Sequence, residues 1–130
     1  MENIIYTGER ARKWLSHDKY KGYEYVIMTL GTHPVAYINL PEDNKYFKVD
    51  CSDIDIDCHG GCTYSSEYIL DEDGHKYMGN WWIGWDYAHY GDYIKYPFEY
   101  NITIFTTGYT RIWNVDSITE EVKRVIDSFE

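Results

Sequence analysis

The distribution of hydrophobic and polar residues along the chain predicts a series of β-strands. Residues 23–30 and 35–40 are rich in β-branched and aromatic side chains, and Gly31-Thr32-His33-Pro34 between them is a typical turn sequence. Further strands are expected at 62–70, 76–87, 101–105 and 110–113, with a turn at 71–74. We therefore expect a sheet whose neighbouring strands are joined by hairpins or tight bends.

The strictest alternation in the chain lies between Asp53 and His59. In an extended chain successive side chains point to opposite sides, so a period of two separates an apolar face from a polar face. The apolar face consists of Ile54, Ile56 and Cys58, and the polar face of Asp53, Asp55, Asp57 and His59. This pattern predicts a strand with one side in the core.

Helix signals occur near both ends of the chain. Ser117-Ile118-Thr119-Glu120 is a capping box that predicts the start of a C-terminal helix. The apolar stripe of this helix would pack on the sheet and consists of Ile118, Val122, Val125, Ile126 and Phe129. Near the N-terminus, Thr7 can cap a short helix that continues through Trp14 and Leu15.

Central strands and terminal helices together indicate an α+β fold. We expect a single domain over residues 1–130, with an antiparallel or mixed sheet, a short N-terminal helix and a C-terminal amphipathic helix packed on the sheet. A length of 130 residues suits one domain, and 18% aromatic residues exclude a disordered chain. No stretch is apolar enough for a membrane helix and the first residues lack a secretory signal pattern, so we expect a cytoplasmic protein.

Negative charge is concentrated in the middle of the chain. The net charge is −10, and between Asp50 and Asp92 there are ten acidic residues and one basic residue, Lys76. Binding of duplex nucleic acid depends on clustered Lys and Arg, so this composition argues against it. The acidic region suits a basic partner or a cation, or it is simply a solvated face.

The first candidate site is the sequence His59-Gly60-Gly61-Cys62-Thr63. Adjacent glycines let a ligand approach backbone N–H groups, and an imidazole can act as acid, base or hydrogen-bond donor. The alternative is a tight hairpin in which His59 is hydrogen-bonded to the backbone.

No metal or cofactor is expected at this site. Zinc is disfavoured because Cys58 and His59 are adjacent and would lie on opposite faces of a strand. The alternating aspartates do not suit one hard cation, since same-face positions lie about 6–7 Å apart along a strand. The odd number of cysteines, 3, indicates reduced thiols rather than a disulfide framework.

The second candidate site is the aromatic segment 81–92. If extended, it places Trp81, Ile83, Trp85, Tyr87 and His89 on one side and Trp82, Gly84, Asp86 and Ala88 on the other. One interpretation is that Gly84 leaves a gap beside Trp82 where a flat ring can stack, with Asp86 as hydrogen-bond acceptor; the alternative is that the tryptophans form core. Asp86, His89 and Asp92 recur at intervals of three, and a histidine flanked by carboxylates is suited to proton transfer.

These motifs resemble those of a group of short, mostly uncharacterised proteins of bacteriophages and prophages. The group is marked by a Gly-His-Pro turn, a His-Gly-Gly-aliphatic-Thr-aromatic-Ser motif and a Trp-Trp-x-Gly-aromatic-Asp-x-Ala-His-x-Gly-Asp motif. The corresponding segments here are 31–34, 59–65 and 81–92, with Thr32 inserted in the first and Cys62 at the aliphatic position of the second. The resemblance covers most of the chain and implies a phage context, in which small acidic proteins often act against host defence.

Three functions are compatible with these features. The first is a counter-defence protein that sequesters a nucleotide-like molecule between the two motifs. The second is a hydrolase that cleaves a nucleotide signal, with His59 and His89 as catalytic residues and Asp86 orienting one imidazole. The third is an acidic inhibitor that occludes a basic, nucleic-acid-binding groove of a host defence protein.

Both pocket hypotheses require the two motifs to face each other across a common hollow. The expected ligand-binding residues are His33, Gly60, Gly61, Thr63, Trp82, Asp86, Asp92 and Arg111. The 15 tyrosines also suggest a surface on which a second copy docks to form a homo-oligomer.

Overall fold

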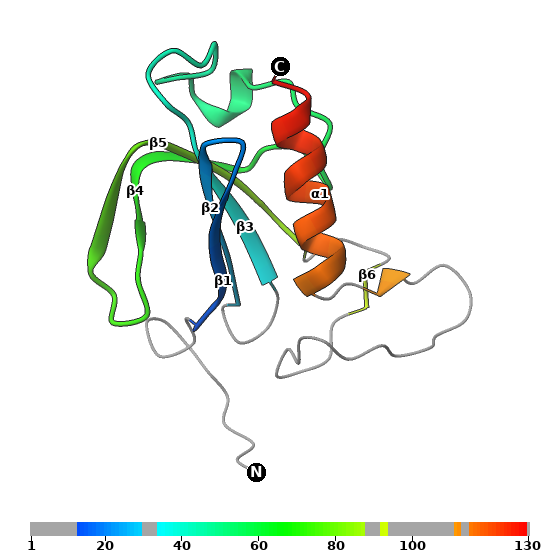
Figure 1. The fold of residues 1–130 in the computed structure, drawn as a ribbon. Helices are drawn as coiled ribbons and strands as arrows, with labels where there is room; N and C mark the ends of the chain where they lie inside the picture. Colours follow the sequence, from blue (N-terminus) through cyan, green and yellow to red (C-terminus); the bar gives the residue numbers. More distant parts are fainter. Residues whose placement is uncertain (1–12, 30–33, 88–91, 94–110, 113–114, 130) are drawn as a thin grey trace.

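The computed structural model describes residues 13–29, 34–87, 92–93, 111–112 and 115–129. Within these residues, five strands form one antiparallel sheet in the order β1-β2-β3-β5-β4 (Figure 1). The strands are β1 (Lys13–Tyr20), β2 (Tyr23–Thr29), β3 (Pro34–Asn39), β4 (Tyr64–Leu70) and β5 (Lys76–Asp86). Two short strands, β6 (Asp92–Tyr93) and β7 (Arg111–Ile112), form a separate parallel pair.

Four of the expected strands are confirmed as β2, β3, β4 and β5, because their β-branched and aromatic residues suit a pleated, half-buried surface. Of the expected strand at 110–113, residues 111 and 112 form β7. The turn between β4 and β5 is confirmed as well. The Asp71 carboxylate accepts hydrogen bonds from the backbone N–H groups of Asp73 and His75, both at 2.9 Å. The expected strand at 101–105 and most of the turn at 31–34 lie outside the described residues.

The expected N-terminal helix is wrong where the structure tests it, since Trp14 and Leu15 belong to β1. Its earlier part, 7–12, lies outside the described residues. β1 pairs with β2 through a two-residue loop in which Lys21 and Gly22 have φ of 51° and 85°. Positive φ at both central residues is the turn geometry that matches the twist of paired strands, so hairpin pairing prevails over the weak helix signal.

The segment 53–59 is not a strand. Cys51–Asp53 forms a short 3-10 helix capped by the Asp50 side chain, and the residues that follow have no strand partner. The expected sidedness nevertheless holds at six of the seven positions: Ile54, Ile56 and Cys58 pack against the core and the three aspartates are exposed. The period of two therefore indicated which side chains are buried, but it could not show whether the backbone pairs with a neighbouring strand.

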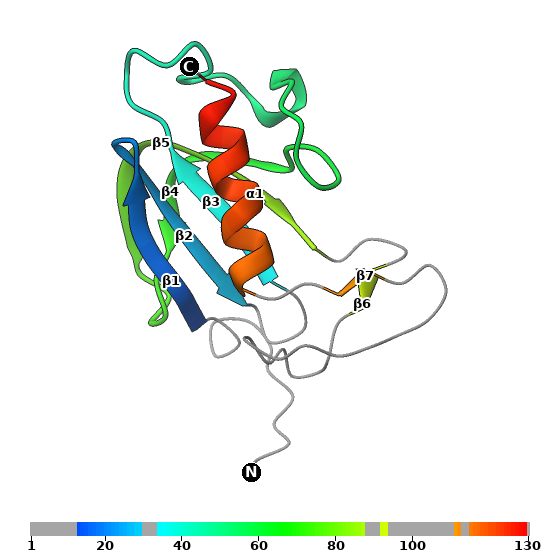
Figure 2. The same cartoon turned by 45° about the vertical axis from the view of Figure 1, so that its right-hand side comes forward.

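Helix α1 (Val115–Asp127) packs across β1, β2 and β3 (Figure 2). It begins two residues before the expected capping box, and the Thr119 hydroxyl donates to the backbone carbonyl of Val115 at 2.7 Å. The expected stripe is confirmed: Ile118, Val122, Val125 and Ile126 are buried and Phe129 is partly buried against the same core. The fold class α+β is thus confirmed.

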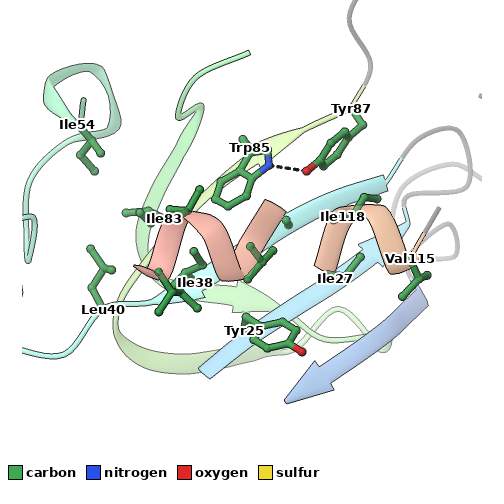
Figure 3. Packing of buried hydrophobic residues seen from close by; sticks show 14 residues of the cluster. Tyr25, Ile27, Ile38, Leu40, Ile54, Ile83, Trp85, Tyr87, Val115 and Ile118 are labelled. Atoms are coloured by element: carbon green, nitrogen blue, oxygen red, sulfur yellow. Dashed lines mark hydrogen bonds between the residues drawn. The ribbon is translucent and has the colours of Figure 1, made fainter. Parts of the chain in front are cut away.

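The sheet carries a hydrophobic core on each face. The first core lies under α1 and draws Ile27 from β2, Ile38 from β3 and Trp85 from β5 (Figure 3). The second core lies on the opposite face and consists of Val26, Met28, Val35, Ile69 and Trp82, flanked by Trp14, Tyr37, Tyr64 and Tyr77.

The second core has no helix over it because the sheet curls around it. Trp14 of β1 donates its backbone N–H to Glu72 at 2.8 Å and its indole Nε1–H to the Leu70 carbonyl at 3.2 Å. β1 and β4 are the two edges of the sheet, so these bonds bring opposite edges together.

None of the helices in the described ranges has the length and apolar content needed to cross a membrane.

Candidate functional site

Parts of the two sequence motifs contact each other directly in the described residues. The Thr63 N–H donates to the Gly84 carbonyl at 2.8 Å, and the His59 ring stacks on Tyr87 with centroids 5.1 Å apart and ring planes 4° apart. His59 is half-buried rather than on a polar face. The chain before β4 is thus fastened along the end of β5.

A turn presents His59 at this junction. The Gly61 N–H donates to the Cys58 carbonyl at 3.0 Å, so His59 and Gly60 are the central residues of the turn. Gly60 has φ of 72°, which is the left-handed value that favours glycine at the second central position. A Cβ at Gly61 would meet nothing within 4 Å, and Thr63 is exposed, so the outer side of the turn is open.

The inner side of the junction is filled by a buried polar network. Glu121 of α1 is 8% exposed, and its carboxylate accepts hydrogen bonds from Tyr87 Oη, Trp85 Nε1 at 3.2 Å and Arg124 at 3.0 Å (Figure 3 shows the bond from Trp85 to Tyr87). Burial, together with the Glu121 charge, raises the pKa of Tyr87 far above its usual value. The network fixes α1 on β5 and leaves packed side chains where a common hollow was expected.

The neighbouring thiols are chemically quiet. Burial is the main cause that raises the pKa of Cys58 to about 12, with a further contribution from the Glu121 charge, and burial also raises the pKa of Cys62. Both groups are therefore thiols at neutral pH. Cys51, Cys58 and Cys62 are free cysteines, as expected from their odd number.

The expected stacking gap beside Trp82 is wrong. Trp82 is 0% exposed in the second core, and a Cβ at Gly84 would lie 2.5 Å from the ring of Tyr37. Gly84 therefore makes room for a ring of the chain itself, and Trp82 offers no face to a ligand.

Asp86 is not brought to the side of His59. It pairs with Val35 of the second core, so its register position lies on the face opposite Trp85 and Tyr87. Asp92 and Arg111 are register partners in the β6–β7 pair. His33 and His89 lie outside the described residues, so only a meeting of His89 with His59 stays a prediction.

Seven of the ten acidic residues of the middle of the chain lie in two groups, one before β4 and one in the turn after it, and Figure 1 shows the segments that carry them at opposite ends of the strand. Asp71, Glu72 and Asp73 occupy the turn after β4, whereas the aspartates at 50, 53, 55 and 57 precede it. β4 has 7 residues, which is about 20 Å of extended chain. The two acidic groups are thus separated by the length of β4, on which Glu67 is the one acidic residue.

We call the first group the acidic segment: Asp50, Asp53, Asp55 and Asp57. All four are exposed, while Ile54 and Ile56 between them pack into the first core. Tyr46 donates its hydroxyl to the Asp55 carbonyl at 2.9 Å, and Arg124 of α1 bonds the Asp57 carbonyl at 2.9 Å and its carboxylate at 3.1 Å. The backbone that carries these carboxylates is therefore held in place by Tyr46 and Arg124.

A possible cation site at the other acidic group is explained by the turn itself. Asp71, Asp73 and His75 have ligand atoms within 4.8 Å of one another. The Asp71 oxygen already accepts two backbone N–H groups, and this local bonding accounts for the grouping.

A polar cluster centred on Glu24 was not predicted from the sequence. Glu24 of β2 accepts hydrogen bonds from His17 Nε2 at 2.6 Å, Tyr77 Oη at 2.5 Å and Asn39 Nδ2 at 3.2 Å. Asn39 is the register partner of Glu24 on β3, and His17 comes from the other neighbouring strand, β1. Tyr77 comes from β5, which is not a neighbour of β2, so its bond to Glu24 requires the sheet to curl. The one available signal was Glu24 itself, a charged residue in the mainly apolar and aromatic strand β2. Its presence does not indicate which side chains donate hydrogen bonds to it.

Comparison of the chain with protein-family models, curated proteins and solved structures found no match.

Proposed function

We propose that this chain is a binding protein that docks on a basic surface of a partner protein through the acidic segment. The observation that carries the proposal is the alternation of exposed aspartates with core-anchored isoleucines between Asp53 and Asp57. Anchoring restricts the segment before a partner arrives, so binding orders less of the chain and loses less entropy.

The contact with Arg124 supports a guanidinium as the group that the segment binds. One nitrogen of Arg124 lies 2.9 Å from the Asp57 carbonyl oxygen and 3.1 Å from its carboxylate, and Asp57 remains 96% exposed. A planar guanidinium with several donors suits such paired oxygens better than an ammonium does. Asp53 and Asp55 offer further carboxylates along the same backbone.

The resemblance to phage and prophage proteins extends the proposal to a biological setting. The partner would be a nucleic-acid-binding protein of host defence in the bacterial cytoplasm, and the chain would act by covering its basic groove. Charge complementarity of this kind speeds association and makes the affinity depend on salt.

A nona-arginine peptide tests the proposal by calorimetry at two salt concentrations. We expect the double variant Asp53→Asn/Asp55→Asn to bind the peptide about tenfold more weakly at low salt, because two anchored charges are lost. The matched control, Asp73→Asn/Asp116→Asn, removes the same charge elsewhere and should bind within about twofold of the unchanged protein. Equal weakening in both variants would mean that only net charge matters, and it would overturn the proposal.

The turn at His59 favours a second candidate function, binding of a nucleotide-like molecule. What supports it is the stacked His59 ring beside the open space at Gly61. Calorimetry with candidate signal nucleotides should then give binding that His59→Ala abolishes. Recovery of the nucleotide unchanged after heat denaturation indicates capture, recovery as a cleaved product indicates the hydrolase, and no binding of any nucleotide rejects both.

A further inference from the structure

The cluster around Glu24 holds an imidazole in one orientation. The His17 ring is hydrogen-bonded through Nε2 to Glu24 and lies edge-on to Trp14 and Tyr77, with centroids at 5.1 Å and 5.7 Å. Trp14 is itself fixed by its two bonds to the β4–β5 hairpin. Each neighbour of the ring is thus held in place by the curled sheet.

The same contacts determine which ring nitrogen is available. With its proton on Nε2, His17 donates to the carboxylate and keeps a lone pair on Nδ1. Nδ1 makes no hydrogen bond among the described residues, and the side chain is 39% exposed. A carboxylate behind one nitrogen and solvent at the other is the arrangement that orients a general base.

The partners of Glu24 keep it suited to this role. Burial raises the pKa of the Glu24 carboxyl, but the hydrogen bonds from Tyr77, His17 and Asn39 outweigh burial and hold that pKa below its ordinary value. Glu24 is therefore a carboxylate at neutral pH, although its side chain is only 18% exposed. A fixed negative charge beside Nε2 stabilises the imidazolium that forms when Nδ1 takes a proton.

We propose that His17, oriented by Glu24, is a general base for hydrolysis of neutral, aromatic or short-chain carboxylic esters. Nδ1 takes a proton from a water molecule, and the oxygen of that water attacks the ester carbonyl carbon. The bond between this carbon and the leaving oxygen then breaks, and the imidazolium returns the proton to the leaving oxygen. The products are a carboxylic acid and an alcohol, and no co-reactant is needed.

The surroundings of His17 select this substrate class. Trp14 and Tyr77 are partly buried against the second core, and the part of each ring that stays accessible beside His17 suits an acyl or aryl group. The carboxylates of Glu24 and Glu72, the latter bonded to the Trp14 N–H, disfavour an anionic substrate such as a phosphate ester. This site is separate from the acidic segment, so the two proposals can fail independently.

Hydrolysis of 4-nitrophenyl acetate tests the proposal, with 4-nitrophenyl phosphate as the anionic comparison. We expect His17→Gln, which can still donate to Glu24 but is no base, to lower the rate constant about tenfold or more. The control, His75→Gln, removes an exposed histidine of the β4–β5 turn and should keep the rate. Phosphate ester should not be cleaved.

Two further variants separate chemistry from folding. His17→Ala should recover activity with added imidazole, above the rate that imidazole gives without protein. Glu24→Gln should lose activity that imidazole does not restore, since the base is still present but no longer oriented. Equal losses in the His17 and His75 variants, absence of imidazole rescue in a folded His17→Ala protein, or equal cleavage of the phosphate ester would each overturn the proposal.

Discussion

Glu24 shows how a charged residue is kept on the inner face of a sheet. Its three donors come from three different strands, so the carboxylate satisfies polar groups and ties those strands together. An unpaired carboxylate at this depth would instead disfavour the fold. The residue is therefore both the centre of a candidate site and a structural link.

The lowered pKa of Glu24 predicts a pH dependence of stability. A carboxyl whose pKa is lower in the folded state than its ordinary 4.5 contributes stability above that pH and loses it as the pH falls through the folded value. The free energy of unfolding, measured with urea between pH 6 and about pH 3, should therefore fall more steeply for the unchanged protein than for Glu24→Gln. Glu42→Gln, at an exposed position, should keep the full slope; a slope unchanged in Glu24→Gln would contradict the assignment.

At the scale of elements, hydrophobic periodicity was a good guide to burial and a weaker guide to pairing. The strands β2, β3 and β5 could be predicted because their apolar residues continue over a length that suits a buried sheet. The segment 53–59 has a stricter alternation, yet the carbonyls of Asp55 and Asp57 accept hydrogen bonds from Tyr46 and Arg124 instead of from a strand. Those partners are distant in sequence, so no local pattern could reveal them.

The acidic segment is therefore expected to depend on its buried positions rather than on a backbone ladder. Ile54→Ala should lower the free energy of unfolding by about 2–4 kcal/mol, because it removes a buried side chain from the first core. Asp55→Ala should change it by less than about 0.5 kcal/mol, since that side chain is exposed. Urea unfolding of both variants checks this, and equal effects would show that Ile54 is not anchored.

At the candidate sites too, some contacts could be predicted from the local sequence, and others depend on residues that are distant in the sequence. The meeting of His59 with the end of β5 could be expected from two motifs that are each rich in chemistry. Filling of the space at Gly84 by Tyr37 depends on the register between β3 and β5, and the contact of Tyr77 with Glu24 across an intervening strand depends on the curl of the sheet. Such curvature comes from tertiary packing and has no simple signature in the sequence.

At the scale of the whole molecule, one sheet joins two cores that do not touch across it. β2 contributes Val26 and Met28 to one core and Tyr25 and Ile27 to the other, and β5 contributes in the same alternating way. A change in either core must therefore be felt by strands that belong to both. We infer that the described part of the chain unfolds as one cooperative unit.

Native-state hydrogen exchange tests this coupling. Val26→Ala, in the core away from the helix, should lower the global free energy of unfolding by about 2 kcal/mol. The amides of Val122 and Val125, at buried positions of α1, should lose the same protection as the amide of Ile83 in β5, because we expect both to open only when the sheet does. The control Met78→Ala, at a side chain that is 60% exposed, should leave both unchanged. If α1 kept its protection while β5 lost it, the two cores would be independent units, and the buried network from Glu121 to β5 would not couple the helix to the sheet.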